Sequence, residues 1–251
     1  GPAGEPALGP AALPHRASAY ANLMAPISHH WLDATHITFG VATVGVFTKQ
    51  WKAEASVFNG REPDENRRNL DLATMNSYSG RVWWMPTPRW AVQVSAGHLV
   101  EAEPAHEDLP VADKNLVTTS VSHTRRLAAH NSFWASTVAW GRASDTLGTT
   151  SQWLLAETSV ARNAFDTWFG RAEIGTKPPH DLSVHGLTEP QGLGKLQGGY
   201  VRHAEARRGW EPGVGFTISA SMANAVLASR YGGRVTYGAG VFATVRPKST
   251  H

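Results

Sequence analysis

The stretch SYSGRVWWMPTPRWAVQVSAG, residues 77–97, has the clearest structural pattern in the chain. Within Tyr78–Trp84, and again within Trp90–Ala96, every even-numbered residue is apolar, aromatic or glycine, and most residues between them are polar. Successive side chains of a strand point to opposite faces, so this period of two predicts a β-hairpin with one apolar and one polar face. Pro86 and Pro88 lack the amide proton that strand pairing requires, which places them in the connection between the two strands.

The same alternation recurs along residues 34–247 and predicts about eleven strands in a single domain that covers residues 1–251. Every second connection is short, as at residues 48–50, whereas the others are long, as at residues 175–194. This regularity puts the tight turns at one end of an antiparallel meander and the large loops at the other, as in outer-membrane barrels. The sequence therefore predicts an all-β fold, specifically an antiparallel up-and-down transmembrane β-barrel.

Residues 1–33 are rich in proline, glycine and alanine, and we expect them to form a long external loop. Both ends of a bacterial single-chain barrel normally lie in the periplasm, whereas the first predicted strand starts from this loop. We therefore expect an odd number of strands to precede the chain. The whole barrel would contain about 12 or 14 strands, and residues 1–251 would be its C-terminal part.

The bulk composition narrows the class of protein. The mean hydropathy is −0.29, and no apolar run approaches the roughly twenty residues of a membrane-spanning helix. The net charge is +3, and arginine and lysine form no block of the kind that binds nucleic acid, so we expect no nucleic-acid partner. The chain contains no cysteine, so its stability must come from packing or from closure of the sheet rather than from disulfides.

Aromatic residues recur towards the ends of the apolar faces, where amphipathic rings are stable at the boundary of a bilayer. The residues expected to form this lipid girdle are Trp51, Tyr78, Trp84, Trp90, Trp134, Trp140 and Trp168. The alternative is a soluble barrel or sandwich with one solvated face, which explains the period of two equally well. It accounts less well for the loop lengths and for the placement of tryptophan.

The opposite faces carry charges that would be costly in a dry core, at about several kcal/mol for each ion that is not well paired. In a water-filled lumen the same charges cost little, and rings of charge at a constriction select ions. The candidates for the lumen or constriction are Lys52, Glu54, Arg61, Glu62, Asp64, Arg81, Glu157, Arg171 and Glu173. Residues 60–68 can also be interpreted as a solvated loop with weak local ion pairs.

One cluster has the composition of a metal site. His29, His30, Asp33 and His36 offer imidazole and carboxylate ligands that suit Zn²⁺, Cu²⁺ or Ni²⁺. An extended backbone would turn Asp33 and His36 to opposite faces, so an intact site requires a turn there. The alternative is a loop whose side chains form hydrogen bonds at the mouth of the barrel, without a divalent metal.

No catalytic signature is present. The sequence contains neither GxSxG nor HExxH, so we do not expect an enzyme. A hydrolase that pairs His98 or His123 with a nearby serine on the barrel wall is the remaining enzymatic hypothesis.

The chain is similar to a family of uncharacterised bacterial outer-membrane β-barrel proteins. The phrases that carry the resemblance are GEPALGP (4–10), HHWLDATHITFGV (29–41), SVFNGREPDE (56–65), SYSGRVWWMPTP (77–88), AWGR (139–142) and YGGRVTYGAGVFATVRP (231–247). The resemblance covers nearly the whole chain and implies a secreted precursor with further strands before the GEPALGP loop. It implies no activity, substrate or catalytic residue. The chain departs from the usual aromatic end of such barrels by continuing through RPKSTH.

These observations predict a passive pore or small-solute channel in the bacterial outer membrane. Its partners would be outer-membrane lipid and small polar solutes, and the charged lumen would set its selectivity. The second hypothesis is an outer-membrane barrel that binds a ligand or a metal through the histidine-rich external loop, and the third is an outer-membrane hydrolase.

Overall fold

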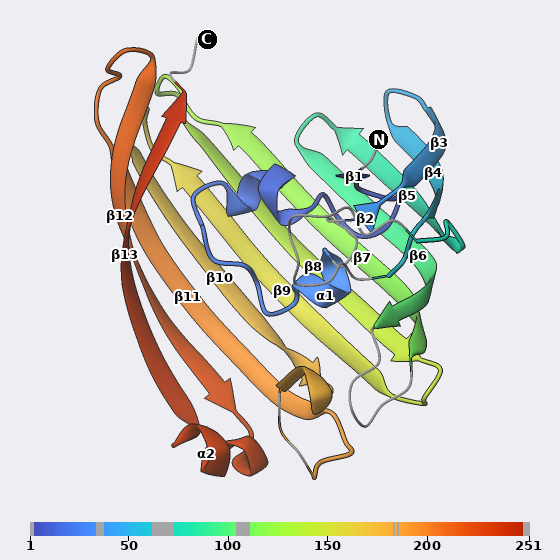
Figure 1. The fold of residues 1–251 in the computed structure, drawn as a ribbon. Coiled ribbons are helices and arrows are strands. Elements are labelled where there is room, and N and C mark those ends of the chain that lie inside the picture. The colour runs from blue at the N-terminus through green and yellow to red at the C-terminus, as the bar shows by residue number, and fades with distance from the viewer. Residues whose placement is uncertain are drawn as a thin grey trace.

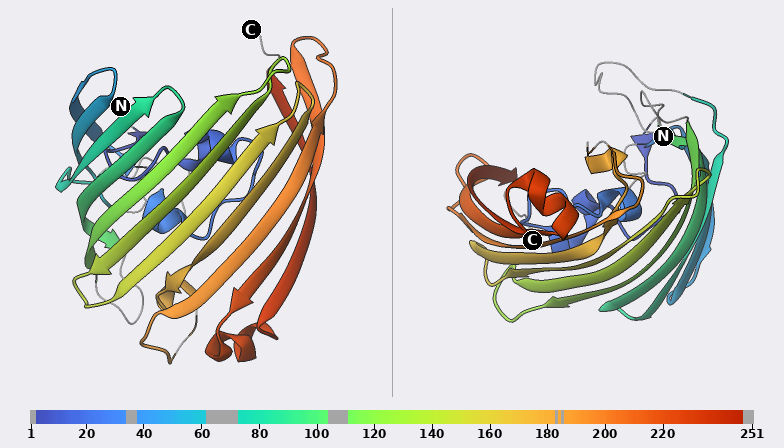
Figure 2. Two further views of the ribbon diagram at one scale, coloured as in Figure 1. Left: turned by 180° about the vertical axis from the view of Figure 1, so that it is seen from behind. Right: turned by 90° about the horizontal axis from the view of Figure 1, so that it is seen from below.

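A computed structural model describes residues 3–33, 38–61, 73–103, 111–182, 184 and 186–247. Eleven antiparallel strands form one sheet, in which each strand pairs with its neighbours in the sequence (Figure 1). The structure confirms the predicted all-β, antiparallel up-and-down fold. The sheet is strongly curved but not closed, because the strands at its two edges, β3 and β13, do not pair with each other (Figure 2).

The strands of the large sheet follow the predicted hydrophobic alternation. They are β3 (Val41–Phe47), β4 (Trp51–Phe58), β5 (Ser77–Thr87), β6 (Trp90–Glu103), β7 (Ala112–Arg126), β8 (Phe133–Asp145), β9 (Thr150–Ala161), β10 (Asp166–Lys177), β11 (Gln191–His203), β12 (Trp210–Ala223) and β13 (Val235–Pro247). The remaining elements are short: β1 (Ala3–Gly4) pairs with β2 (Thr38–Phe39), and the helical segments are η1 (Leu13–His15), η2 (Ala17–Ala19), α1 (His29–Leu32), η3 (His180–Leu182) and α2 (Ala225–Tyr231). No helix among the described residues is long and apolar enough to cross a membrane.

The predicted hairpin is formed by β5 and β6, with Val82 opposite Val94 on the apolar face and Arg81 opposite Ser95 on the polar face. The turn itself differs from the prediction. Pro86 lies inside β5, where the register shifts between Trp84 and Thr87, and the tight turn consists of Pro88 and Arg89. A register irregularity tolerates proline because no regular ladder hydrogen bond is required there.

Two other boundaries differ from the sequence prediction. Gly40 adopts φ +80°, and this left-handed conformation breaks the expected first strand into β2 and β3. The connection between β8 and β9 consists only of residues 146–149, because both strands extend into the predicted loop. The strict alternation of short and long connections is therefore wrong at this point, although the up-and-down order holds.

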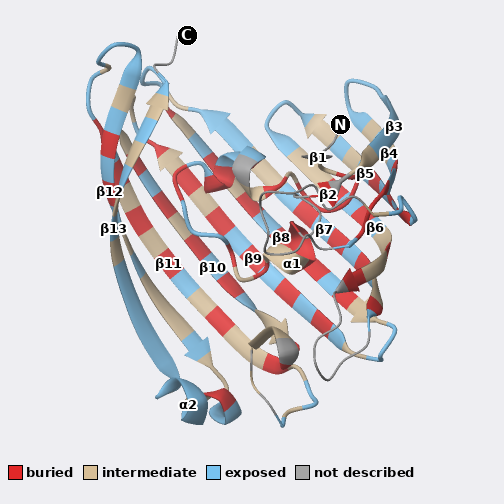
Figure 3. Ribbon diagram, viewed as in Figure 1, coloured by how far each residue is buried: buried red, intermediate tan, exposed pale blue. Residues whose placement is uncertain are grey.

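The two faces of the sheet differ in the way that the alternation predicts. Along β9, for example, Leu154 and Ala156 are exposed on the convex face, whereas Leu155 and Glu157 are buried on the concave face. The same exchange of buried and exposed residues runs along neighbouring strands (Figure 3). The sheet therefore shows apolar side chains to its surroundings and turns polar side chains inward.

The concave face is covered by residues 3–33, which we call the N-terminal segment (Figures 1 and 2). Its Leu8, Trp31 and Leu32 join a buried apolar cluster with residues of the sheet, including Trp153 and Leu155. Gly141 permits the close approach, because a Cβ at this position would lie 2.8 Å from the carbonyl oxygen of Trp31. The expectation of an external loop is thus corrected: the segment packs against the sheet.

Candidate functional site

The candidate site is the charged contact between the N-terminal segment and the middle of the concave face. Its centre is Glu157 on β9. One carboxylate oxygen, Oε1, accepts a hydrogen bond from Arg16 Nε at 2.5 Å, and the other, Oε2, accepts one from Arg171 Nε at 3.0 Å. The Ser18 hydroxyl also lies 2.8 Å from Oε1. A single carboxylate therefore binds an arginine of the sheet and an arginine of the N-terminal segment.

Arg16 has a second acidic partner within its own segment. Its Nη1 donates to Asp33 Oδ1 at 3.0 Å, and the same Nη1 donates to the carbonyl oxygen of Ala11 at 3.0 Å. Burial alone lowers the pKa of the Arg16 guanidinium, but the charges of Asp33 and Glu157 more than offset this effect, so its pKa is raised. Arg16 is consequently a permanent cation.

The four charged groups are almost completely removed from solvent. The side chains of Arg16 and Glu157 are 3% and 1% exposed, and those of Asp33 and Arg171 are 1% exposed. Two guanidinium and two carboxylate groups balance one another in charge. A buried ion that loses its partner costs much more free energy than an exposed one. The cluster therefore stabilises the packing of the N-terminal segment on the sheet only when all four groups are present.

A second charged group binds the start of the segment. Arg81 on β5 donates from Nη1 to the carbonyl oxygen of Gly9 at 3.1 Å and from Nε to Glu54 Oε2 at 3.2 Å. Lys52 lies 2.8 Å from the other oxygen of Glu54. At the far side of the central cluster, Glu173 on β10 accepts hydrogen bonds from the amide and the hydroxyl of Ser28, at 3.0 and 2.8 Å.

Further hydrogen bonds, four between neutral groups and one from the Arg246 guanidinium, attach the segment to other strands. The pairs are Ala7 N with Ser56 Oγ (2.7 Å), Gly9 N with Ser95 Oγ (2.8 Å), Trp31 Nε1 with Ser151 Oγ (2.8 Å), Asn22 Nδ2 with Gln197 Oε1 (3.3 Å) and Arg246 Nη1 with Tyr20 Oη (2.5 Å). The contacts extend from β4 to β13. The N-terminal segment is therefore bonded to the sheet across nearly its whole width.

The structure brings together six of the predicted lumen residues on the concave face: Lys52, Glu54, Arg81, Glu157, Arg171 and Glu173. Arg61 instead lies at the surface, where it pairs with Glu101. The predicted constriction residues Glu62 and Asp64 lie outside the described residues.

Sequence reasoning missed Arg16, Ser18 and Ser28, which are the polar partners supplied by the N-terminal segment. Arg16 is the only arginine or lysine in residues 1–33, and this isolation among small residues was the available signal. Their role could not be inferred because the partner residues lie more than a hundred positions away in the sequence.

The predicted girdle residues lie on the convex face. Six of them are exposed, namely Trp51, Tyr78, Trp84, Trp90, Trp134 and Trp168, and Trp140 is partly buried. Trp51 stacks on Trp84 across the β4–β5 pair, with ring centroids 5.9 Å apart. The ring centroid of Trp168 lies 4.6 Å from that of Tyr200 on β11, a residue that the sequence did not suggest. The connections 48–50, 88–89, 127–132, 162–165 and 204–209 lie at one end of the sheet, which we call the tight-turn end. The rings that lie near it form what we call the aromatic row: Trp51, Trp84, Trp90, Trp134, Trp168 and Tyr200.

The residues of the predicted metal cluster have other contacts. Asp33 binds Arg16, and the Nδ1 atom of His29 lies 2.9 Å from the carbonyl oxygen of Pro26. The rings of His29 and His30 meet edge to face at 4.0 Å, and His36 lies outside the described residues. Within the described part of the chain, no three histidine or acidic residues are grouped in a way that would hold a metal ion.

The two histidines considered for hydrolysis lie on the convex face. His98 contacts Asn115 Oδ1 through Nδ1 at 2.9 Å, and His123 lies between the rings of Trp90 and Trp134. Both positions are on the side of the sheet opposite the charged cluster.

The geometry thus contains a curved wall and a polar segment that is bonded to its inner side. The charged cluster holds this segment against the sheet, and loss of one charge from it would leave another charge buried without its partner. Comparison of the chain with protein-family models, curated proteins and solved structures gives no match, so the interpretation that follows rests on the chain's own geometry.

Proposed function

We propose that the chain forms most of the wall of an outer-membrane β-barrel that conducts small polar solutes, with the N-terminal segment as an internal plug. The observation that carries this proposal is the inverted distribution of polarity. Valine, leucine, isoleucine and tryptophan side chains are exposed along the convex face, whereas arginine, glutamate and glutamine side chains are buried on the concave face. A barrel in a bilayer has this distribution, because its outside contacts lipid and its inside is polar.

The extent of the exposed apolar surface supports a lipid environment. Large apolar side chains are exposed from Val57 on β4 to Val241 on β13. The apolar face therefore spans the sheet and is not an isolated patch. Monomeric soluble proteins rarely expose more than about 300–600 Å² of contiguous apolar surface. The aromatic row at the tight-turn end is where a bilayer boundary would place amphipathic rings.

The plug explains the charges on the concave face. In an open lumen Arg81, Glu157 and Arg171 would be bathed in water, whereas here each of them is buried by the N-terminal segment or bonded to it. We therefore expect the intact protein to conduct weakly. Deletion of residues 5–28 from the full-length protein is expected to increase its conductance in planar bilayers.

The conductance experiment has a matched control. Arg61→Ala changes an exposed ion pair away from the plug and is expected to leave the conductance unchanged. A deletion variant that folds but conducts no more than the intact protein contradicts a plugged pore.

Lipid contact can be tested through tryptophan fluorescence. We expect phospholipids with brominated acyl chains to quench the emission of the reconstituted protein, because the convex tryptophans would touch the chains. Replacing both Trp84 and Trp168 by phenylalanine is expected to reduce the quenched fraction, since both side chains are exposed on the convex face. Trp153→Phe, on the concave face, serves as the control.

A soluble protein would give the opposite result in the same experiment. Its emission would be insensitive to brominated lipid and would respond equally to an aqueous quencher with and without vesicles. Membrane fractionation of the full-length precursor, with gel mobility in detergent before and after heating, provides an independent measurement.

A further inference from the structure

The tight-turn end of the sheet carries an excess of positive charge. Its connections contain Lys49, Arg89, Arg162, Arg207 and Arg208 but only one acidic residue, Glu205. Arg125 and Arg126 end β7 at the same edge. This end also carries the aromatic row, so cations and amphipathic rings occur together at one boundary of the apolar face.

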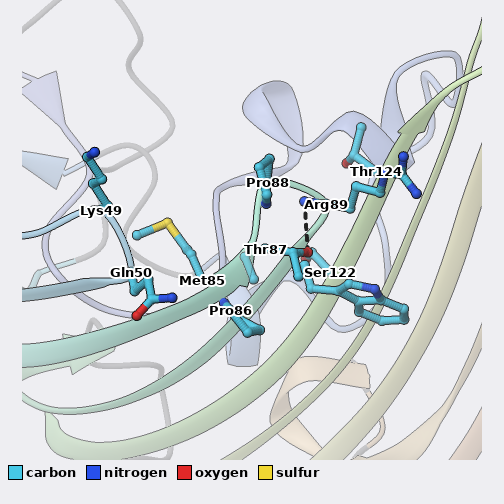
Figure 4. Close-up of a pocket in the computed structure, with 11 residues that line it drawn as sticks. Lys49, Gln50, Met85, Pro86, Thr87, Pro88, Arg89, Ser122 and Thr124 are labelled. Atoms are coloured by element: carbon cyan, nitrogen blue, oxygen red, sulfur yellow. Dashed lines mark hydrogen bonds between the residues drawn. The ribbon is translucent and has the colours of Figure 1, made fainter.

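A hollow on the convex face combines these two kinds of residue. It is lined by Arg89 of the β5–β6 turn, Trp90 of β6, His123 and Arg125 of β7, and Trp134 and Val138 of β8. The His123 ring lies 4.6 Å from the Trp90 ring and 5.4 Å from the Trp134 ring. A second hollow adjoins it through Arg89 and Trp90 and is lined by Lys49 on its other side (Figure 4).

We propose that this hollow is a binding site for the headgroup of an anionic phospholipid, an inference that rests on the proposed membrane location. Arg89 and Arg125 are exposed, and among the described residues neither guanidinium has an ion-pair or hydrogen-bond partner. Guanidinium groups bind phosphate oxygens through paired, charge-assisted hydrogen bonds. Two unpartnered guanidinium groups on the rim of one hollow therefore match the charge of a lipid phosphate.

The rest of the hollow fits the remainder of a lipid molecule. Trp90 and Trp134 form its sides at the depth where indole rings prefer the bilayer interface. Val138 continues from the hollow into the exposed apolar face, with Val121 opposite it on β7. A phosphate at the arginines would thus direct the acyl chains along these valines, which free phosphate could not exploit.

The experiment uses the full-length protein, delipidated in detergent and titrated with phosphatidylglycerol or phosphatidylcholine, with native mass spectrometry as the readout. We expect phosphatidylglycerol to bind more tightly. The double variant Arg89→Gln/Arg125→Gln is expected to weaken this binding roughly 30-fold, the factor that corresponds to about 1 kcal/mol for each cation near a lipid surface. Heat-modifiable gel mobility verifies that the variant is folded.

The matched control is Arg207→Gln/Arg208→Gln, which removes two cations from the same end of the sheet but outside the hollow. An equal loss in both double variants would show a general charge effect and would overturn the site. Displacement of phosphatidylglycerol by millimolar inorganic phosphate would overturn a lipid site in favour of a simple phosphate site. Insertion into bilayers without preference for anionic lipid refutes this inference alone, whereas failure to insert refutes the proposed function as well.

Discussion

Replacement of Glu157 by alanine is expected to lower the free energy of unfolding by about 3–5 kcal/mol, because it leaves Arg16 and Arg171 buried without their shared carboxylate. We expect the substitution to weaken the attachment of the N-terminal segment before it unfolds the sheet, because Arg16 of this segment binds Glu157 directly. The measurements are urea unfolding of the folded protein in detergent and limited proteolysis within residues 3–33. We expect faster cleavage of this segment while the sheet is still folded.

Arg61→Ala provides the comparison for this variant. The ion pair of Arg61 with Glu101 is about half exposed on both sides, so its removal should cost no more than about 1 kcal/mol. If both variants, Glu157→Ala and Arg61→Ala, lose a similar, small amount of unfolding free energy, the central cluster is open to water in the native protein. The buried contact between Arg16 and Glu157 would then not be what holds the plug in place.

Replacement of Val138 by arginine is expected to destabilise the protein in lipid vesicles by about 2–4 kcal/mol, the cost of an arginine near the bilayer midplane. Val138 lies midway along β8 on the convex face and is 51% exposed. Because it has this exposure, the same substitution in a soluble protein should change the free energy of unfolding by no more than about 0.5 kcal/mol. The stability measurement therefore separates the two environments.

Val245→Arg is the matched control for depth. Val245 is also an exposed convex valine, but it lies two residues from the end of β13 that is on the tight-turn side of the sheet. An arginine close to the bilayer interface should cost only about 0–1 kcal/mol. Equal effects at Val138 and Val245 would argue against a membrane boundary between these two depths.

The sheet could be predicted from the sequence because the pattern that specifies a strand lies in neighbouring residues. A period of two assigns each side chain to a face, and the alternation in residues 77–97 therefore gave the correct inward position of Arg81 and the correct outward position of Trp84. The boundaries were less accurate where one residue overrides the pattern. Gly40 ends a strand through its backbone conformation, which periodicity does not report.

The site could be predicted only in part, since half of it is non-local. The sequence placed Glu157, Arg171 and Glu173 on the polar face but offered no way to find their partners. Residues 1–33 have no periodic pattern, so nothing in them indicates which surface they contact. Their position is determined by shape and by single polar groups, as when Trp31 packs against Gly141 and donates to Ser151.

The attachment of the N-terminal segment at both flanks of the sheet also affects the shape of the wall. Ala7 is fixed to Ser56 on β4, and Tyr20 is fixed to Arg246 on β13, so the chain between them acts as the chord of an arc. The contour length of a chord limits how far the two ends of its arc can separate. Residues 8–19 therefore place an upper limit on the separation of β4 and β13 while both attachments hold, and a longer segment would raise this limit.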